Sequence, residues 1–145
     1  MSGAFGVFGG SFDPPHLGHT LLAAYALTAY ELERVIVVPT FAHPFAKQLS
    51  AFEDRMRMCE LAFADLRKLE ISDIEQQLPV PSLTLNTIEA LSKLHSGVQL
   101  RLLIGSDLTA QTSSWHAFAR VAAPPASLGT MTGFDESIAS SVTYP

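Results

Sequence analysis

Apolar and polar positions alternate along this chain with a period that changes several times. The run "AFGVF" (residues 4–8) is apolar and ends in glycines, which predicts a short buried strand. Apolar residues in "TLLAAYALTAYELE" (residues 20–33) recur at helical spacing. The β-branched run "RVIVVP" (residues 34–39) stops at a proline and predicts a second strand. The first 39 residues therefore predict a strand, a helix and another strand.

The same alternation continues to about residue 120. The segment "SAFEDRMRMCELAFADL" (residues 50–66) predicts a helix with a capping box formed by Ser50 and Glu53. Cys59 lies on the apolar stripe of this helix, and we interpret it as an inert buried thiol. A third strand is expected in "LEISDI", a helix with Thr84 as N-cap in "TLNTIEALSKLH", a fourth strand in "VQLRLLIG" (residues 98–105) and a short helix in "SSWHAFARVA".

Strands that alternate with helices in this order predict an α/β fold, a Rossmann-like doubly wound parallel sheet with helices on both faces. In such sheets ligands bind beyond the carboxyl ends of the strands. Residues 121–145 break the pattern, because they contain no lysine or arginine and are interrupted by prolines and glycines. We expect one domain over residues 1–145, with residues 121–145 as an atypical tail that is shortened or partly disordered.

Composition narrows the function. The 145 residues carry a formal net charge of -5, which argues against a broad nucleic-acid-binding surface but allows a local pocket for a small anion. The single cysteine excludes an intrachain disulfide and favours a cytoplasmic location. The amino terminus is unlike a signal peptide, and no apolar run is long enough to span a membrane, so neither nucleic acid nor membrane is an expected partner.

The segment "GGSFDPPHLGH" (residues 9–19) carries the candidate chemistry. Gly9 and Gly10 stand between a predicted strand and a predicted helix, where glycine lets backbone N–H groups come close to a ligand and adopt positive φ. A helix start adds free N–H groups and the positive end of the helix dipole, which suits a phosphate. Pro14 and Pro15 stiffen the connection.

His16 and His19 are three residues apart at the expected helix start, which places both imidazoles on one face. Two imidazoles beside free N–H groups can donate to a phosphoryl oxygen and stabilise charge in a transition state. A structural histidine pair is the plainer explanation. Zinc is another, although no cysteine or carboxylate lies at a helpful local spacing.

Together these residues resemble a known signature. "GGSFDPPHLGH" is similar to the motif of the nucleotidyltransferase superfamily of the His-x-Gly-His type, and most resembles its form in bacterial nicotinate-nucleotide adenylyltransferases. Three further segments resemble that family in the same order: "VPTFAHPFAKQLSAFEDRMRMCELAF", "PSLTLNTIEAL" and "LLIGSDLTAQTSSWHAF". The likeness runs from about Gly6 to Val121.

The resemblance implies transfer of AMP from ATP to nicotinate mononucleotide in NAD biosynthesis, with pyrophosphate as the second product. It implies two small-molecule substrates and Mg²⁺ carried by the ATP phosphates, with no protein metal site, and leaves a homo-oligomer open. Catalysis of this kind consists of positioning and charge stabilisation.

The resemblance also assigns residues. It implies that His16, His19 and Lys47 contact phosphates as the catalytic groups. The nucleotide would be bound by Gly9, Gly10, Ser11, Phe12, Gly105 and Asp107. The pyridine end of the acceptor would be bound by Ser82, Thr84 and Trp115. We interpret Arg55 and Arg57 as surface or ion-pair residues.

The chain departs from the family at two places. Leu83 stands where the family usually has an aromatic residue. The family's carboxy-terminal Ser-Ser-Thr-x-Ile-Arg motif is not found, because "IASSVTYP" has no following arginine. Two alternatives therefore stay open, an ATP-binding homologue with little activity and an adenylyltransferase for another acceptor, nicotinamide mononucleotide or phosphopantetheine. The pantetheine enzyme usually has threonine where His16 stands.

Overall fold

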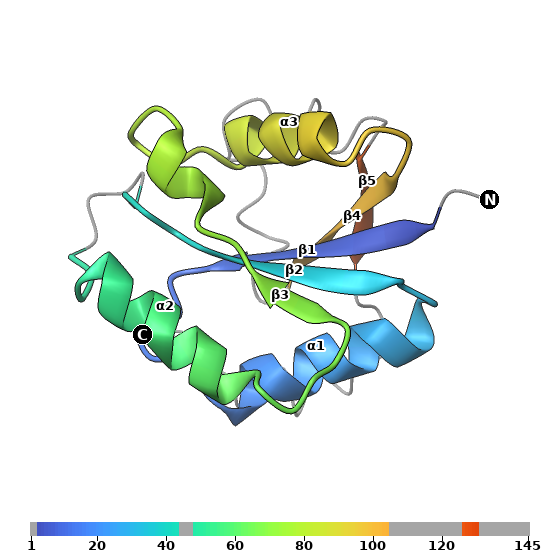
Figure 1. Ribbon diagram of the computed structural model, residues 1–145, viewed down its shortest axis with the longest axis horizontal. Coiled ribbons are helices and arrows are strands. Elements are labelled where there is room, and N and C mark those ends of the chain that lie inside the picture. Colours follow the sequence, from blue (N-terminus) through green and yellow to red (C-terminus); the bar gives the residue numbers. More distant parts are fainter. Residues whose placement is uncertain (1–2, 44–47, 105–125, 131–145) are drawn as a thin grey trace.

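The computed structural model describes residues 3–43, 48–104 and 126–130 (Figure 1). Its elements, in chain order, are β1 (Ala4–Gly10), α1 (Leu17–Ala29), β2 (Arg34–Pro39), α2 (Phe52–Ala62), β3 (Leu69–Ile71), the 3₁₀-helix η1 (Ile74–Gln77), α3 (Thr84–Leu94), β4 (Gln99–Ile104) and β5 (Ala126–Thr130).

Within the described residues, five strands form one sheet in the order β3-β2-β1-β4-β5, and every pairing is parallel. Phe8 of β1 lies opposite Val37 of β2 on one side and Leu103 of β4 on the other. The chain thus builds outward from β1 to β3 and then returns to add β4 and β5 on the other side. This reversal creates a topological switch point beside the carboxyl end of β1, where open α/β sheets bind ligands. The expected fold class is confirmed.

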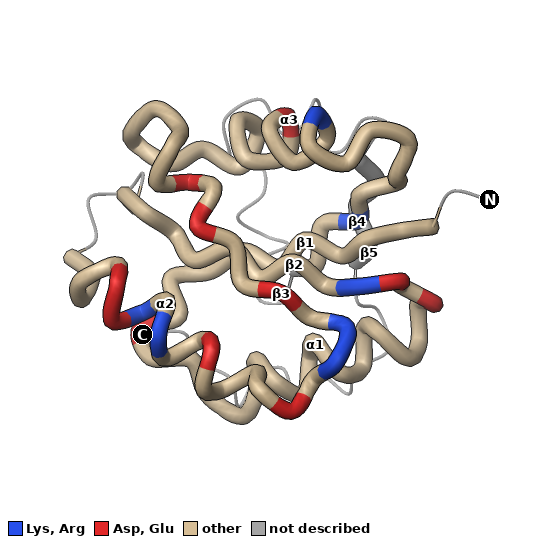
Figure 2. The backbone as a smooth tube through the Cα atoms, viewed as in Figure 1, with Lys and Arg blue, Asp and Glu red and all other residues tan. Residues whose placement is uncertain are grey.

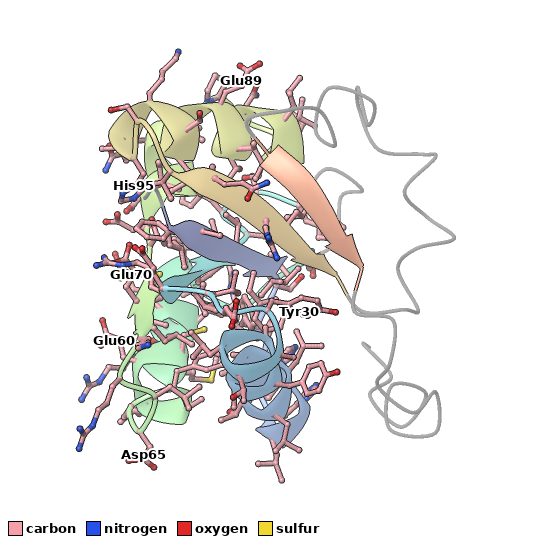
Figure 3. The ribbon with its side chains drawn as sticks, turned by 90° about the vertical axis from the view of Figure 1, so that its right-hand side faces the viewer. Tyr30, Glu60, Asp65, Glu70, Glu89 and His95 are labelled. Carbon is pink, nitrogen blue, oxygen red and sulfur yellow. The ribbon has the colours of Figure 1, made fainter. Side chains whose placement is uncertain are left out.

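Helices cover the two faces of the sheet in two layers (Figures 1 and 3). α3 packs on one face, where Val7, Ile36 and Leu91 belong to one apolar cluster. α1 and α2 pack on the opposite face, where Phe8 and Cys59 belong to a second cluster. Successive residues of β1 point to opposite faces, so Val7 and Phe8 serve different clusters. Figure 3 shows Glu89 on the outer side of α3 and Asp65 at the far side of the other layer.

Three expected boundaries are wrong. α1 begins at Leu17 and ends at Ala29, so it starts and stops earlier than its apolar pattern suggests. α2 begins at Phe52 with Ala51 at the cap position and no side-chain cap bond, so the Ser50–Glu53 capping box is absent. Likewise Leu83, not Thr84, holds the N-cap position of α3.

Within the segment expected to be an atypical tail, Ala126–Thr130 forms β5 and pairs in parallel with β4. A short edge strand of this kind carries no pattern that distinguishes it from a loop. The helix expected in "SSWHAFARVA" lies outside the described residues. Charged residues gather on α2, around β3 and before β2, whereas β1 has none (Figure 2). Over the described ranges, no helix is long and apolar enough to cross a membrane.

Candidate active site

The two glycines at the end of the first strand are extended. Gly9 and Gly10 belong to β1 and pair with Val38 and Pro39 of β2. The expected positive φ falls instead on Phe12, at 49°, and the Phe12 ring is 1% exposed. A Cβ on Gly10 would lie only 3.3 Å from the Phe12 ring, so the small residue lets this tight turn close. Burial of its ring holds Phe12 in a conformation that bulky residues rarely adopt.

The turn delivers the chain into α1 with two imidazoles in contact. His16 is the N-cap residue, and His19 is the third residue of the helix. Their rings stack with centroids 3.8 Å apart and an interplanar angle of 25°. The backbone N–H of His16 donates to Nδ1 of His19 over 3.0 Å, which fixes the second ring. Both imidazoles lie on one face, as the spacing predicts.

His19 is buried and neutral. The residue is 3% exposed, and its ring packs on Phe12 with centroids 4.9 Å apart. Burial, and secondarily the charge of His16, lowers the pKa of His19 to about 4. Because Nδ1 accepts a hydrogen bond, the neutral ring carries its proton on Nε2. At neutral pH, His19 is therefore a hydrogen-bond donor through Nε2. We call Gly9–Phe12 together with His16 and His19 the cradle.

The segment after β2 runs beside the cradle. Thr40 donates to the carbonyl oxygen of Gly10 twice, from its N–H over 2.8 Å and from its hydroxyl over 3.2 Å. Two residues later, Ala42 exchanges hydrogen bonds with Ser82: the Ser82 N–H donates to the Ala42 carbonyl, and the Ala42 N–H donates to the Ser82 hydroxyl. Residues 40–42 thus connect the cradle to the segment that precedes α3.

Arg55 is buried, so its interpretation as a surface or ion-pair residue is wrong. The residue is 1% exposed, and its side chain donates from Nη1 to the carbonyl oxygens of Thr40 (2.6 Å) and Ser11 (3.0 Å) and from Nε to that of Ser50 (2.9 Å). Desolvation lowers its pKa, and the charge of Asp13 opposes this. Arg57, in contrast, is exposed and pairs with Glu60 over 3.1 Å, as expected.

Glu75 of η1 is a second buried charge that sequence reasoning missed. It is 8% exposed and accepts hydrogen bonds from the Phe41 N–H (3.1 Å), the Thr87 hydroxyl (2.8 Å) and the Ser82 hydroxyl. Burial raises its pKa, and these hydrogen bonds oppose the shift.

The sequence did contain a signal that Arg55 is buried. Arg55 shares the apolar stripe of α2 with Cys59, four residues later.

The structure brings together part of the site expected from the sequence. The two histidines and Gly9–Phe12 form one cradle at the carboxyl end of β1. Ser82, which is 7% exposed, and Thr84, the first residue of α3, lie on the segment that residue 42 contacts. Lys47, Gly105, Asp107 and Trp115 lie outside the described residues. No group of three His, Cys, Asp or Glu residues in the described part of the chain could hold a metal ion. Cys59 is buried, and desolvation raises its pKa to about 12, so the thiol is inert as expected.

Comparison with known proteins defines the class. The Cytidylyltransferase-like family model matches residues 7–124, and the chain belongs to this nucleotidyltransferase family. Among curated relatives, a probable nicotinate-nucleotide adenylyltransferase of Anaeromyxobacter dehalogenans is 39% identical over 128 residues, which cover 85% of this chain and 68% of the relative. One of the same name from Myxococcus xanthus is 34% identical over 79% of this chain and 61% of its own length.

A solved structure shares the fold. The nicotinic acid mononucleotide adenylyltransferase of Plasmodium falciparum superposes with a TM-score of 0.77 over 94% of this chain and 69% of its own, at 22% identity. At 22% identity the superposition shows a shared fold only. The family and the α/β fold expected from the sequence are thus both confirmed.

Proposed function

We propose that this chain transfers the AMP moiety of ATP to nicotinate mononucleotide and releases pyrophosphate. The observation that carries the proposal is the cradle, in which a stacked histidine pair opens α1 directly beside the end of β1. Relatives at 34–39% identity bear the name of this activity. An oxygen of the mononucleotide phosphate forms a bond to the α-phosphorus of ATP. The bond from that phosphorus to the bridging oxygen breaks, and its electron pair leaves with pyrophosphate.

The cradle would bind the triphosphate. The N–H groups at the start of α1 and the positive end of its dipole favour a phosphoryl anion. His19 donates from Nε2 without carrying a charge in the free protein, and a bound phosphate would raise its pKa toward the imidazolium form. His16 would donate to the same anion from the adjacent ring. We assign stabilisation of the transition-state charge to His19, with Lys47 as a further cation.

The remaining roles follow the family. We assign the adenosine to Gly105 and Asp107, and the pyridine ring to Trp115 by stacking. Thr84 would reach the acceptor from its place as the first residue of α3. The Ser82 hydroxyl bonds Glu75 and the Ala42 N–H, so we assign Ser82 the task of shaping the acceptor site.

We propose that Mg²⁺ enters with ATP. The cradle offers donors rather than carboxylates, so it suits the phosphate oxygens, and the ion would stay on the triphosphate. Its chemistry would be charge neutralisation on the β- and γ-phosphates.

The direct test is product formation. Protein incubated with ATP, Mg²⁺ and nicotinate mononucleotide should release pyrophosphate and form the dinucleotide in equal amounts, both measured by chromatography. Nicotinamide mononucleotide and phosphopantetheine serve as alternative acceptors in the same assay. Tight ATP binding by calorimetry without any product would favour a nucleotide-binding protein. Product with only another acceptor would move the assignment to that substrate.

A further inference from the structure

The peptide group that joins Thr40 to Phe41 is held from both ends by buried charges. Its carbonyl oxygen accepts from Arg55 Nη1 over 2.6 Å, and its N–H donates to Glu75 Oε2 over 3.1 Å. The bond is trans, so its C=O and N–H point in opposite directions. Arg55 therefore approaches from the α2 layer and Glu75 from the layer that holds η1 and α3.

We propose that Arg55 and Glu75 are positioning residues, which clamp the Thr40–Phe41 peptide and through it hold the cradle in the geometry that AMP transfer requires. The inference rests on the proposed function. It names two side chains that act through the backbone rather than on the substrate.

The clamp reaches the cradle by two routes. Arg55 Nη1 also donates to the Ser11 carbonyl, and Thr40 donates twice to the Gly10 carbonyl. In trans peptides these two carbonyls point away from the N–H groups of Ser11 and Phe12. Because both carbonyls are held toward Thr40 and Arg55, the N–H groups of Ser11 and Phe12 point the opposite way, away from residues 40–42. We expect the ligand on that side.

The energetic argument favours a role beyond stability. Buried charges are costly unless fully hydrogen-bonded, and apolar residues often replace them without loss of stability. Arg55 spends its donors on three main-chain carbonyls, and Glu75 accepts from one main-chain N–H and two hydroxyls. A planar guanidinium suits this task, because its fork directs several donors at fixed angles.

The first experiment separates kcat from KM. We expect Arg55→Met to lower kcat on the order of 100-fold with a much smaller change in KM for ATP, since misplacing reacting groups by about 1 Å has that effect. Arg55→Lys should recover part of the loss, because an ammonium reaches some carbonyls but lacks the planar fork. Arg57→Met, on the exposed face of the same helix, is the matched control and should keep wild-type kcat.

Glu75→Gln is the near-isosteric test. Glutamine keeps the size and shape of this buried side chain, so the variant should retain the fold. We still expect kcat to fall roughly tenfold, because a charge-assisted acceptor of the Phe41 N–H becomes a neutral one. Glu70→Gln, which breaks only an exposed pair with Arg34, is its control. The Arg55→Met/Glu75→Gln double variant should lose less than the product of the single effects, because both residues hold one peptide.

The hydrogen-exchange rate of the Phe41 amide tests the clamp without any substrate, because this N–H donates to Glu75. Glu75→Gln should accelerate it, and Glu70→Gln should not. If the wild type makes no product, the proposed function fails, and the Phe41 amide still decides the clamp. Unchanged Phe41 exchange in Glu75→Gln, or wild-type kcat in a folded Arg55→Met, would overturn the proposal. If Arg55→Met does not fold, Glu75→Gln carries the decision.

Discussion

α1 and α2 lie under the same face of the sheet, yet their first turns are built in different ways (Figure 1). α1 begins with a local arrangement, in which the His16 N–H donates to the side chain of His19. α2 lacks its expected local cap, and its start is held from a distance. The Ser50 N–H donates to Asp13 Oδ2, 37 residues away in sequence, and Arg55 donates to the Ser11 carbonyl, 44 residues away.

The difference shows how the candidate site is divided. The start of α1 carries groups that would touch the phosphates, and a few neighbouring residues define it. The start of α2 instead fixes the strand-to-helix connection of α1 from outside through Asp13 and Arg55. A substitution in the first region should act on chemistry, and one in the second on geometry and stability.

His19→Ala should have the largest effect, because it removes a group at the start of α1 that would touch the phosphates. Removing a donor to a transition-state oxyanion lowers kcat about 100- to 1000-fold. We expect a loss of this size in pyrophosphate release, with the circular dichroism spectrum of the wild type retained. Activity close to the wild type in the folded variant would remove His19 from the mechanism.

The pH dependence of stability should show the next largest effect. Since the folded-state pKa of His19 is about 4 and its ordinary value is 6.5, the unfolded chain binds the proton first as pH falls. Stability is therefore complete above about pH 6.5 and decreases toward pH 4, by up to about 3 kcal/mol. The raised pKa of Glu75 acts with the opposite sign and offsets part of this decrease.

Urea denaturation between pH 4 and 7 would measure how the free energy of unfolding changes with pH. His19→Gln should reduce this slope. A wild-type slope in that variant would show that other groups control acid unfolding.

Asp13→Ala should destabilise the start of α2, with a smaller effect on the free energy of unfolding than the protonation of His19. It removes the carboxylate that accepts from the Ser50 N–H over 2.8 Å, at an exposed position, so we expect a loss of about 1 kcal/mol in the free energy of unfolding. Asp65→Ala, on the far side of this layer in Figure 3, is the matched control. Equal unfolding free energies for the two variants would contradict the long-range cap.

Ser50→Ala should have the smallest effect. An operating N-cap contributes about 1 kcal/mol, whereas Ala51, not Ser50, holds the N-cap position of α2, so we expect a change below about 0.5 kcal/mol. The hydrogen bond from the Ser50 N–H to Asp13 is retained in this variant. A loss as large as that of a true cap, seen in thermal unfolding, would restore the capping box.

The sequence predicted what depends on short-range pattern. The β-branched run at Arg34–Pro39 gave a strand with the observed bounds, and the His16–His19 spacing placed two imidazoles together. The parallel sheet followed from the order of elements.

Long-range contacts account for what the sequence did not predict. Arg55 looked like a surface cation because arginine is usually solvated, although its place beside Cys59 on the apolar stripe pointed inward. Its partners are main-chain carbonyls that only the fold brings together. β5 pairs at the edge of the sheet, and five residues of which the fourth is a glycine carry no strand signal of their own.

The most direct test of the cradle is the titration of the His19 ring by NMR, with and without ATP. Without nucleotide, the ring should titrate with a pKa of about 4. With ATP bound, its pKa should rise, because phosphate charge favours the imidazolium form. An unchanged His19 titration in protein saturated with ATP would place the triphosphate elsewhere and contradict the account.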